Sequence, residues 1–168
     1  VAVGQIPVYH SMLNTGRPYN GEANSKFLSN YLDIPNGPLY PFGYGLSYTT
    51  FEYGNIQISN STMTPMETVI ASINVKNTGK IKDKEVVQLY IRDRVGSISR
   101  PMKELKGFKK IELAPGESKT VSFEINRELL SFYNGDLKWG TEPGKFDIMI
   151  GTNSNEVSSA TLELRYKE

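Results

Sequence analysis

The chain has 168 residues, 38% of them apolar, and a net charge of +1 from 19 basic and 18 acidic side chains. This length suits one domain or one domain with an extension, and the balanced charge argues against nucleic acid as a partner. The absence of cysteine excludes disulfides, thiolate catalysis and cysteine metal sites, and no apolar run approaches the length of a membrane span.

Residues 1–52 are rich in Pro, Gly, Asn and Tyr and show little periodicity. We expect a short strand within residues 1–10, a polar loop at 14–25 and one or two helical turns at 25–33. The chain starts with Val1 and lacks a signal-peptide pattern, which suggests a processed protein or an excised fragment. Because so long an irregular segment is unusual inside a compact domain, we expect it to belong to a larger structure.

The stretch "PLYPFGYGLSYTTF" at residues 38–51 concentrates aromatic side chains among prolines and glycines. It could be a sugar-binding platform, a hydrophobic plug or a joint between two domains. Tyrosine suits all three, because it combines an apolar ring with a hydroxyl that needs a partner. The residues alone favour packing over sugar binding, and the candidate packing residues are Tyr40, Phe42, Tyr44, Tyr48 and Phe51.

Residues 53–168 show the period-two alternation of strands that are buried on one face. The strands are expected at 53–59, 68–76, 85–93, 105–113, 119–126, 145–151 and 160–166. Pro-Gly pairs at 114–117 and 142–145 predict type II turns, and 126–133 predicts a brief helix. The fold class is therefore all-β: a fibronectin III- or immunoglobulin-like β-sandwich of about seven strands, preceded by an irregular Pro/Gly/Tyr-rich extension.

No constellation of residues predicts a catalytic or metal site. His10 is the single histidine, and a structural hydrogen bond is the better interpretation than general acid–base catalysis. The sequence has no serine elbow, no phosphate loop and no calcium-loop spacing at Asp83. The carboxylates of the second part are interpreted as a solvated sheet face: Glu85, Asp93, Glu104, Glu112, Glu124, Asp147 and Glu163.

Two further patterns have competing interpretations. The basic stretch "RPMKELKGFKK" at 100–110 resembles a nucleic-acid patch, but an edge strand protected by lysines is favoured. "NST" at 60–62 matches a glycosylation acceptor, although such triplets also arise by chance.

Four stretches together resemble the carboxy-terminal part of glycoside hydrolase family 3 β-glucosidases of the bacterial periplasmic type. They lie in the family's order at residues 3–18, 26–51, 99–123 and 142–154. The resemblance implies that 1–52 is the tail of a preceding α/β domain with its connector, and that 53–168 is a fibronectin III-like domain. The family's nucleophile and its usual acid/base region lie upstream, so no catalytic residue of this chain is implied.

The resemblance further implies a parent enzyme that releases terminal β-linked glucose with retention and without a cofactor. This chain would be an inactive module that packs on and stabilises the catalytic domains of the same polypeptide, and only the parent would bind carbohydrate substrate. An autonomous carbohydrate-binding module and a fibronectin-type protein-interaction domain are the alternatives. We expect no nucleic-acid or membrane partner, and a homo-oligomer through the extension is possible. The resemblance favours a periplasmic or secreted location over the cytoplasm.

Overall fold

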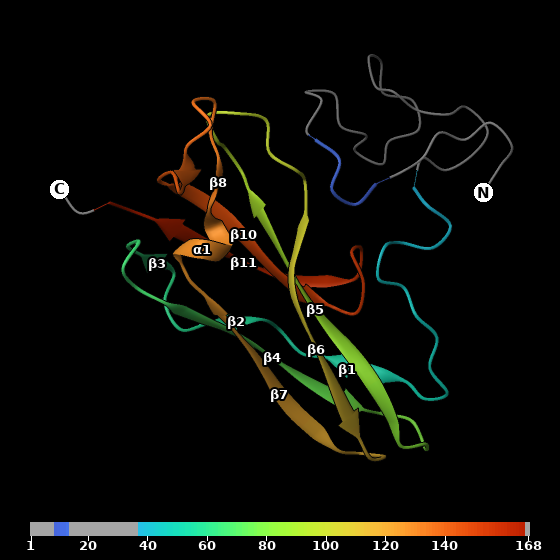
Figure 1. Cartoon of the computed structure of the whole chain (residues 1–168). Helices are drawn as coiled ribbons and strands as arrows, with labels where there is room; N and C mark the ends of the chain where they lie inside the picture. The colour runs from blue at the N-terminus through green and yellow to red at the C-terminus, as the bar shows by residue number, and fades with distance from the viewer. Residues whose placement is uncertain (1–8, 14–36, 167–168) are drawn as a thin grey trace, which may run out of the picture.

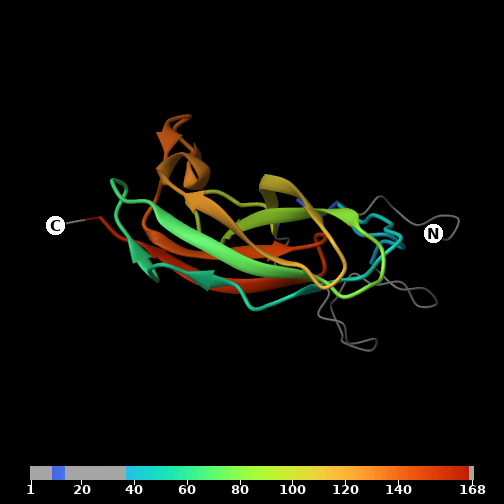
Figure 2. The same cartoon turned by 90° about the horizontal axis from the view of Figure 1, so that it is seen from below.

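The computed structural model describes residues 9–13 and 37–166. These residues form two β-sheets packed face to face, with a small hairpin at one end (Figures 1 and 2). The expected all-β sandwich is confirmed. The loop at 14–25, the helical turns at 25–33 and most of the strand expected within 1–10 lie outside the described residues.

The first sheet is built around β4 (Val69–Asn77), which pairs antiparallel with β1 (Phe51–Tyr53), β2 (Gln57–Ile58) and β7 (Ser118–Ile125). The single strand expected at 53–59 is thus two short strands. The Ile56 N–H between them donates to Ser158 Oγ at 2.9 Å, a contact with the other sheet that interrupts pairing with β4.

The second sheet has the order β3-β11-β10-β5-β6. Its strands are β3 (Thr62–Met63), β5 (Asp83–Asp93), β6 (Glu104–Leu113), β10 (Gly144–Gly151) and β11 (Val157–Leu164). All neighbours are antiparallel except β3 and β11. The lysine-rich β6 lies at the edge of the sheet, as the sequence predicts. Lysines on an edge strand oppose pairing with another chain.

A small subdomain follows β7 and consists of α1 (Arg127–Leu130) and the hairpin of β8 (Phe132–Tyr133) with β9 (Trp139–Gly140). Asn126 caps α1 by accepting the Leu129 N–H at 3.1 Å. The helix is shorter than the predicted 126–133, because the backbone is already extended at Ser131. No helix among the described residues is long and apolar enough to cross a membrane.

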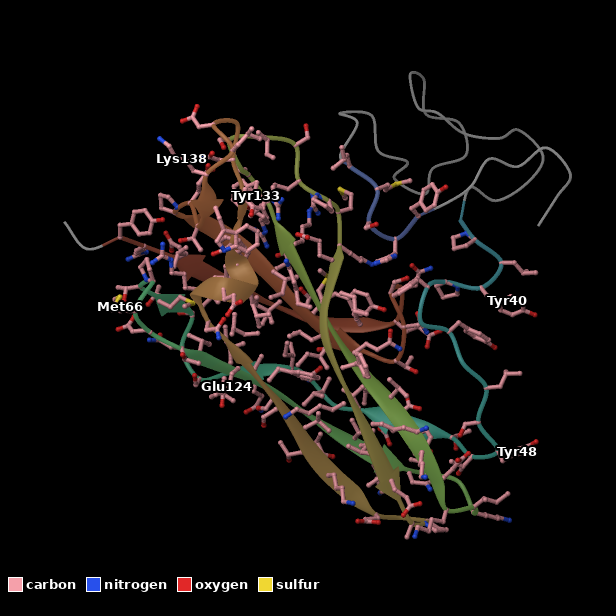
Figure 3. The ribbon with its side chains drawn as sticks, in the orientation of Figure 1. Tyr40, Tyr48, Met66, Glu124, Tyr133 and Lys138 are labelled. Atoms are coloured by element: carbon pink, nitrogen blue, oxygen red, sulfur yellow. The ribbon has the colours of Figure 1, made fainter. Side chains whose placement is uncertain are left out.

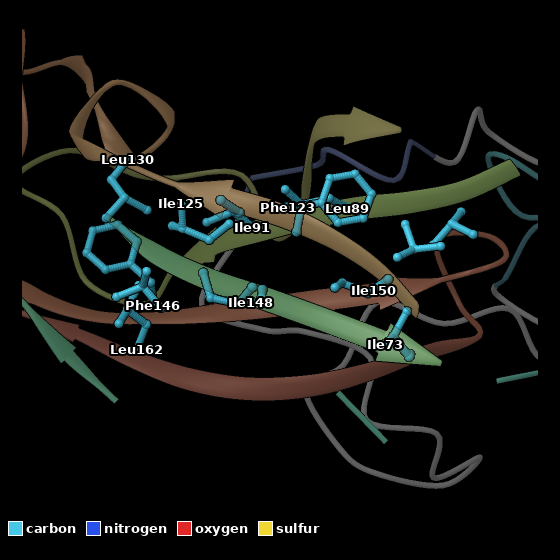
Figure 4. Packing of buried hydrophobic residues seen from close by; sticks show 14 of the residues in the cluster. Ile73, Leu89, Ile91, Phe123, Ile125, Leu130, Phe146, Ile148, Ile150 and Leu162 are labelled. Carbon is cyan, nitrogen blue, oxygen red and sulfur yellow. The ribbon is translucent and has the colours of Figure 1, made fainter. Parts of the chain in front are cut away.

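The core lies between the two sheets, where the alternating apolar side chains of facing strands meet (Figure 4). Its residues include Ala71, Ile73, Val75, Val87, Leu89, Ile91, Val121, Phe123, Ile125, Phe146, Ile148, Ile150, Leu162 and Leu164. The burial of alternate apolar residues that the period-two pattern predicts is therefore confirmed. Burial of each Val, Leu, Ile or Phe side chain of this layer contributes about 1.5–3 kcal/mol, which makes the layer the main source of the sandwich's stability.

The two Pro-Gly sequences have different structures. Gly116 has φ 77° and the Glu117 N–H donates to the Ala114 carbonyl oxygen at 3.0 Å, as in the predicted turn. The prediction for 142–145 is wrong: Gly144 is the first residue of β10, and its φ is not positive. Strand β11 also stops at Leu164, so Tyr166 does not extend it, and its exposed ring contacts Thr141 through the hydroxyl.

Candidate functional site

The connector, defined as residues 37–50, lies beside the five-stranded sheet and leads into β1 (Figure 1). It bends at Pro41, whose carbonyl oxygen accepts the Tyr44 N–H at 3.0 Å. Gly43 has φ 80° at this bend, and a Cβ there would lie 2.0 Å from Gln88 Oε1. Only glycine suits both this conformation and this close approach. Gly43 therefore fixes how the connector meets the sheet.

Gln88, on β5, is the first anchor of the connector. Its Nε2 donates to the carbonyl oxygens of Gly43 at 3.0 Å and Thr152 at 2.6 Å. Its Oε1 accepts the Tyr90 hydroxyl at 2.5 Å, and burial raises the pKa of Tyr90 to about 12, so this hydroxyl stays protonated. The Ser154 N–H also donates to the Phe42 carbonyl oxygen at 2.9 Å. Buried polar groups are thus satisfied across the contact.

Asp83 and Asn77 provide the second anchor. Asp83 Oδ2 accepts the Ser47 hydroxyl at 2.6 Å and the Tyr48 N–H at 3.1 Å. These hydrogen bonds, the Ser47 hydroxyl first, hold the pKa of Asp83 below its usual value. Asn77 Oδ1 accepts the Thr49 hydroxyl at 2.7 Å. The connector is therefore tied to the sandwich at its middle, Phe42–Gly43, and near its carboxy-terminal end, Ser47–Thr49.

The apolar side chains of the connector point the other way, into solvent. Tyr40 is 64% exposed and Tyr48 89% exposed, and both project away from the sandwich in Figure 3. We call the exposed set the connector surface: Leu39, Tyr40, Phe42, Tyr44, Leu46 and Tyr48, of which Phe42 has one ring face covered by His10. Four of the five predicted packing residues thus share one surface. Phe51 does not, because it begins β1 and packs against the sandwich core.

A groove of about 450 Å³ continues the connector surface onto the sheet. On the connector side it is lined by Phe42, Tyr44 and Leu46, and on the sheet side by Val86 and the 66% exposed Phe108, among others. The groove extends the exposed apolar area from the connector to the outer face of β5 and β6. Exposed apolar side chains gathered around a groove are typical of interaction sites.

His10 covers the inner side of the connector. Its imidazole stacks on Phe42 with the ring centroids 3.9 Å apart and lies edge-on to Tyr90 at 6.1 Å. Burial and, to a lesser extent, the Lys103 ammonium lower the pKa of His10. The neighbouring Met12 carbonyl oxygen accepts the Met102 N–H at 2.8 Å. These contacts give His10 a structural environment of aromatic rings.

Glu85 lines a second cleft, of about 610 Å³, near the β10–β11 turn. Its Oε1 accepts the Tyr53 hydroxyl at 2.7 Å and the Thr152 hydroxyl at 2.8 Å. Burial, followed by the hydrogen bond to Glu85, raises the pKa of Tyr53, so its phenol remains protonated. The Tyr53–Glu85 bond joins β1 to β5, one strand from each sheet. A structural role therefore accounts for both side chains.

Asp93 departs from the predicted solvated face. It is 6% exposed, and burial raises the pKa of its carboxyl. Arg100 Nε lies 3.8 Å from its Oδ2, while the Arg100 guanidinium covers the Phe132 ring at 4.2 Å and pairs with Glu104 at 2.8 Å. The interpretation of Asp93 as a solvated carboxylate is wrong, because the Arg100 side chain folds over the end of β5. No cluster of potential metal ligands occurs within residues 9–13 and 37–166.

Sequence reasoning missed the anchors Gln88, Asp83 and Asn77. Each contact spans 28 residues or more along the chain, and an isolated Gln or Asn on a strand gives no signal of such a partner. In the sequence, Gln88 stands at a position of the alternating strand that faces away from the core. A polar residue there could equally face solvent or bond to another segment. The sequence therefore identifies the aromatic residues of the connector but not what holds them outward.

Comparison with known proteins gives the family. Residues 85–154 match the fibronectin type III-like domain. The chain is 55% identical over 163 residues to a periplasmic β-glucosidase of Salmonella typhimurium, covering 97% of this chain and 21% of that protein. It is 48% identical to a β-xylosidase of Formosa agariphila, covering 98% and 22%.

A solved structure agrees. The β-glucosidase of Listeria innocua in complex with isofagomine superposes with a TM-score of 0.89 at 44% identity, over 98% of this chain and 23% of that one. The chain thus spans about a fifth of the length of the curated relatives it matches. We conclude that the chain belongs to the glycoside hydrolase family 3 β-glucosidases, of which it is the carboxy-terminal part with the fibronectin type III-like domain.

Proposed function

We propose that the chain is the non-catalytic carboxy-terminal module of a β-glucosidase, and that its connector surface packs on the catalytic domains of the same polypeptide. One observation supports this most directly: the connector backbone is hydrogen-bonded to the sandwich while Tyr40, Leu46 and Tyr48 are 64%, 90% and 89% exposed. We keep the division of the chain at residue 52, with 1–52 as the tail of the preceding domain and connector and 53–168 as the sandwich.

The energetics favour a packed partner for this surface. Ordering a chain segment costs about 1–2 kcal/mol per residue, and the connector recovers this only partly from its polar anchors. Burying a large apolar side chain adds about 1.5–3 kcal/mol, so coverage of Leu39, Leu46 and Tyr48 would stabilise the joint substantially. A connector that is already held in place loses little further entropy when the partner covers it.

Catalysis is assigned to the rest of the polypeptide. A retaining glycosidase needs a nucleophilic carboxylate and an acid/base carboxyl group about 5–5.5 Å apart across the scissile bond. In this chain Glu85 is engaged by Tyr53 and Thr152, and Asp93 by Arg100 and the Val95 N–H. We therefore propose that the parent removes terminal β-linked glucose in its upstream domains and that this module stabilises them.

The experiment compares two proteins, the 168-residue chain and the longer polypeptide with its catalytic domains. Tyr48→Asp should leave the unfolding temperature of the isolated chain unchanged, because Tyr48 is already exposed there. In the longer protein the same change should destabilise the joint by about 2 kcal/mol or more and lower the unfolding temperature. The isolated chain should not hydrolyse an aryl β-glucoside.

Tyr133→Asp is the matched control, because Tyr133 is 59% exposed at the other end of the sandwich (Figure 3). It should lower the stability of both proteins by the same amount, about 0.5–1.5 kcal/mol, because each loses the packing of Tyr133 on Trp139. An unchanged unfolding temperature for Tyr48→Asp in the longer protein would refute the docking role. Hydrolysis by the isolated chain would refute the non-catalytic assignment. If the isolated chain is instead a dimer that Tyr48→Asp dissociates, the surface joins two copies.

A further inference from the structure

The β8–β9 hairpin presents two aromatic rings to solvent. Tyr133 and Trp139 are direct partners in the strand register, with ring centroids 5.0 Å apart and planes 57° to each other. Tyr133 is 59% exposed and Trp139 55%. Aromatic side chains of this size are mostly buried, so an exposed pair that packs together is typical of a binding surface.

The hairpin loop holds the two rings in place. Asn134 Oδ1 accepts the N–H groups of Asp136 and Lys138, each at 3.0 Å, and the Leu137 N–H donates to the Asn134 carbonyl oxygen at 3.0 Å. Leu137 has φ 59°, a left-handed conformation that costs a non-glycine residue energy. The loop is therefore a defined turn, and the aromatic pair needs little reorganisation to bind a ligand.

A cleft of about 430 Å³ lies beside Trp139. Pro65 and Met66 contribute an apolar wall, and Met66 is 90% exposed. The remaining lining comes from Glu67, Thr68, Asn126, Arg127, Glu128 and Ser131. An apolar ring and a few polar groups around one concave surface are the usual composition of a small-ligand site.

Two of the polar groups of the cleft belong to the short helix α1, whose position is fixed. Arg127 and Glu128 belong to α1, which Asn126 caps and whose Leu130 is buried in the core. Within the described residues, neither the Arg127 nor the Glu128 side chain makes a hydrogen bond or ion pair, so both can turn toward a ligand. One guanidinium beside the carboxylates of Glu67 and Glu128 gives no strong field of either sign. The cleft therefore favours a neutral ligand rich in hydroxyl groups over a polyanion.

We infer that this cleft binds an oligosaccharide of β-linked pyranose units. A pyranose ring with equatorial hydroxyls has flat C–H faces, which stack on Trp139, and a rim of hydroxyls that can donate to Glu128 and accept from Arg127. Tyr133 does not line the cleft but packs against the Trp139 ring and holds it in position. The choice of β-linked glucose as the probe rests on the proposed function. The binding surface itself does not, because the hairpin and Met66 lie at the opposite end of the sandwich from Tyr40 and Tyr48 (Figure 3).

The test uses Trp139, the only tryptophan of the chain, as its own reporter. The 168-residue chain is titrated with cellotetraose and laminaritetraose while the tryptophan emission is recorded. We expect a saturable change with a Kd of about 1 mM or tighter. Tyr133→Ala and Arg127→Ala should each weaken binding by about tenfold, and Tyr48→Ala, an exposed tyrosine outside the cleft, should leave it unchanged.

Calorimetry on Trp139→Ala provides the second readout, independent of fluorescence, and should show no binding heat. No saturable response to either tetrasaccharide would overturn the inference, as would binding that Tyr133→Ala and Arg127→Ala both leave intact. If Trp139 emission responds to the catalytic domains but to neither sugar, the cleft is a protein interface and the inference is wrong. None of these outcomes depends on Tyr48→Asp in the longer protein, so the two proposals can fail separately.

Discussion

Gln88 Nε2 donates to the carbonyl oxygen of Gly43 at 3.0 Å, a bond between a buried strand and a connector 45 residues earlier in the chain. The side chain of Gln88 is also bonded to Thr152 and Tyr90, so one amide joins the connector, the β10–β11 turn and β5. The amide of Gln88 therefore helps to set the position of the connector surface, together with the second anchor at Asp83 and Asn77.

Replacing Gln88 should release the connector. Gln88→Ala leaves the carbonyl oxygens of Gly43 and Thr152 and the Tyr90 hydroxyl without their partner, which should cost about 2 kcal/mol of unfolding free energy. The Ser154 amide, which donates to Phe42, should exchange its hydrogen faster. Urea unfolding and hydrogen exchange measure the two effects. The exposed Gln57→Ala is the control, and equal loss in both variants would contradict the anchor role.

His10 should titrate below its ordinary value. Burial first, and Lys103 second, lower its pKa from 6.5, and its single resonance can be followed by NMR because the chain has one histidine. Phe42→Ala removes the stacked ring and should return the pKa toward 6.5. Lys103→Gln should raise it less, since burial is the larger cause. A midpoint at or above 6.5 in the unaltered chain would show that His10 is not covered.

The lowered pKa of His10 also makes the stability of the folded chain depend on pH. The folded chain binds a proton at His10 less readily than the unfolded chain, so this group favours folding above pH 6.5. Its contribution is lost as the pH falls from 6.5 through the lowered pKa. Phe42→Ala should flatten the stability profile in this window, which thermal unfolding at a series of pH values can measure.

Asn77 holds the end of β4 by a complete set of side-chain hydrogen bonds. Its Nδ2 donates to the carbonyl oxygens of Ile81 at 2.8 Å and Leu113 at 3.0 Å, and its Oδ1 accepts from Thr49 and the Gly79 N–H. Asn77 is fully buried, so Asn77→Ala should cost about 3 kcal/mol by leaving these groups unpaired.

Asn77→Asp should lower the free energy of unfolding more at pH 7 than at pH 4. At pH 7 its ionised carboxylate would face the carbonyl oxygens of Ile81 and Leu113. Asn60→Ala is the matched control, since its side chain makes only a long, exposed bond of 3.4 Å to the Thr62 N–H. That variant should stay within about 0.5 kcal/mol of the unaltered chain in urea unfolding. A similar loss in the Asn77 and Asn60 variants would show that the buried network contributes little.

The strands of the core could be predicted because alternation in the sequence specifies a buried face. Val69 to Val75 on β4 and Phe146 to Ile150 on β10 alternate as one-sided strands require, and the structure buries them. The two-residue strands β3, β8 and β9 could not be predicted, because two residues show no period. The turn predicted at 142–145 was wrong for a related reason: a Pro-Gly pair is typical of a turn but also occurs where a strand begins, as at Gly144.

The connector was predictable in its chemistry but not in its geometry. An excess of Tyr and Phe between prolines indicates a packing surface, whereas the sequence does not show which rings face inward. Phe42 meets His10, Phe51 joins the core, and Tyr48 is exposed, although all three are aromatic residues of one stretch. These directions depend on long-range partners, which local sequence patterns do not encode.

Gly151 closes the turn between β10 and β11, and no other residue should replace it without loss. A Cβ at this position would lie 1.9 Å from the Glu156 carbonyl oxygen and 2.7 Å from Val157 Cα, both backbone atoms. The backbone of the turn must therefore move, which should cost Gly151→Ala about 2–3 kcal/mol. Gly140, in β9, is the matched control, because a Cβ there meets nothing within 4 Å and its φ is not positive. Gly140→Ala should change the urea midpoint little or raise it slightly by reducing the entropy of the unfolded chain. Equal midpoints for the two variants would show that the β10–β11 turn can shift to accept a side chain, and that the close approach at Gly151 is not required.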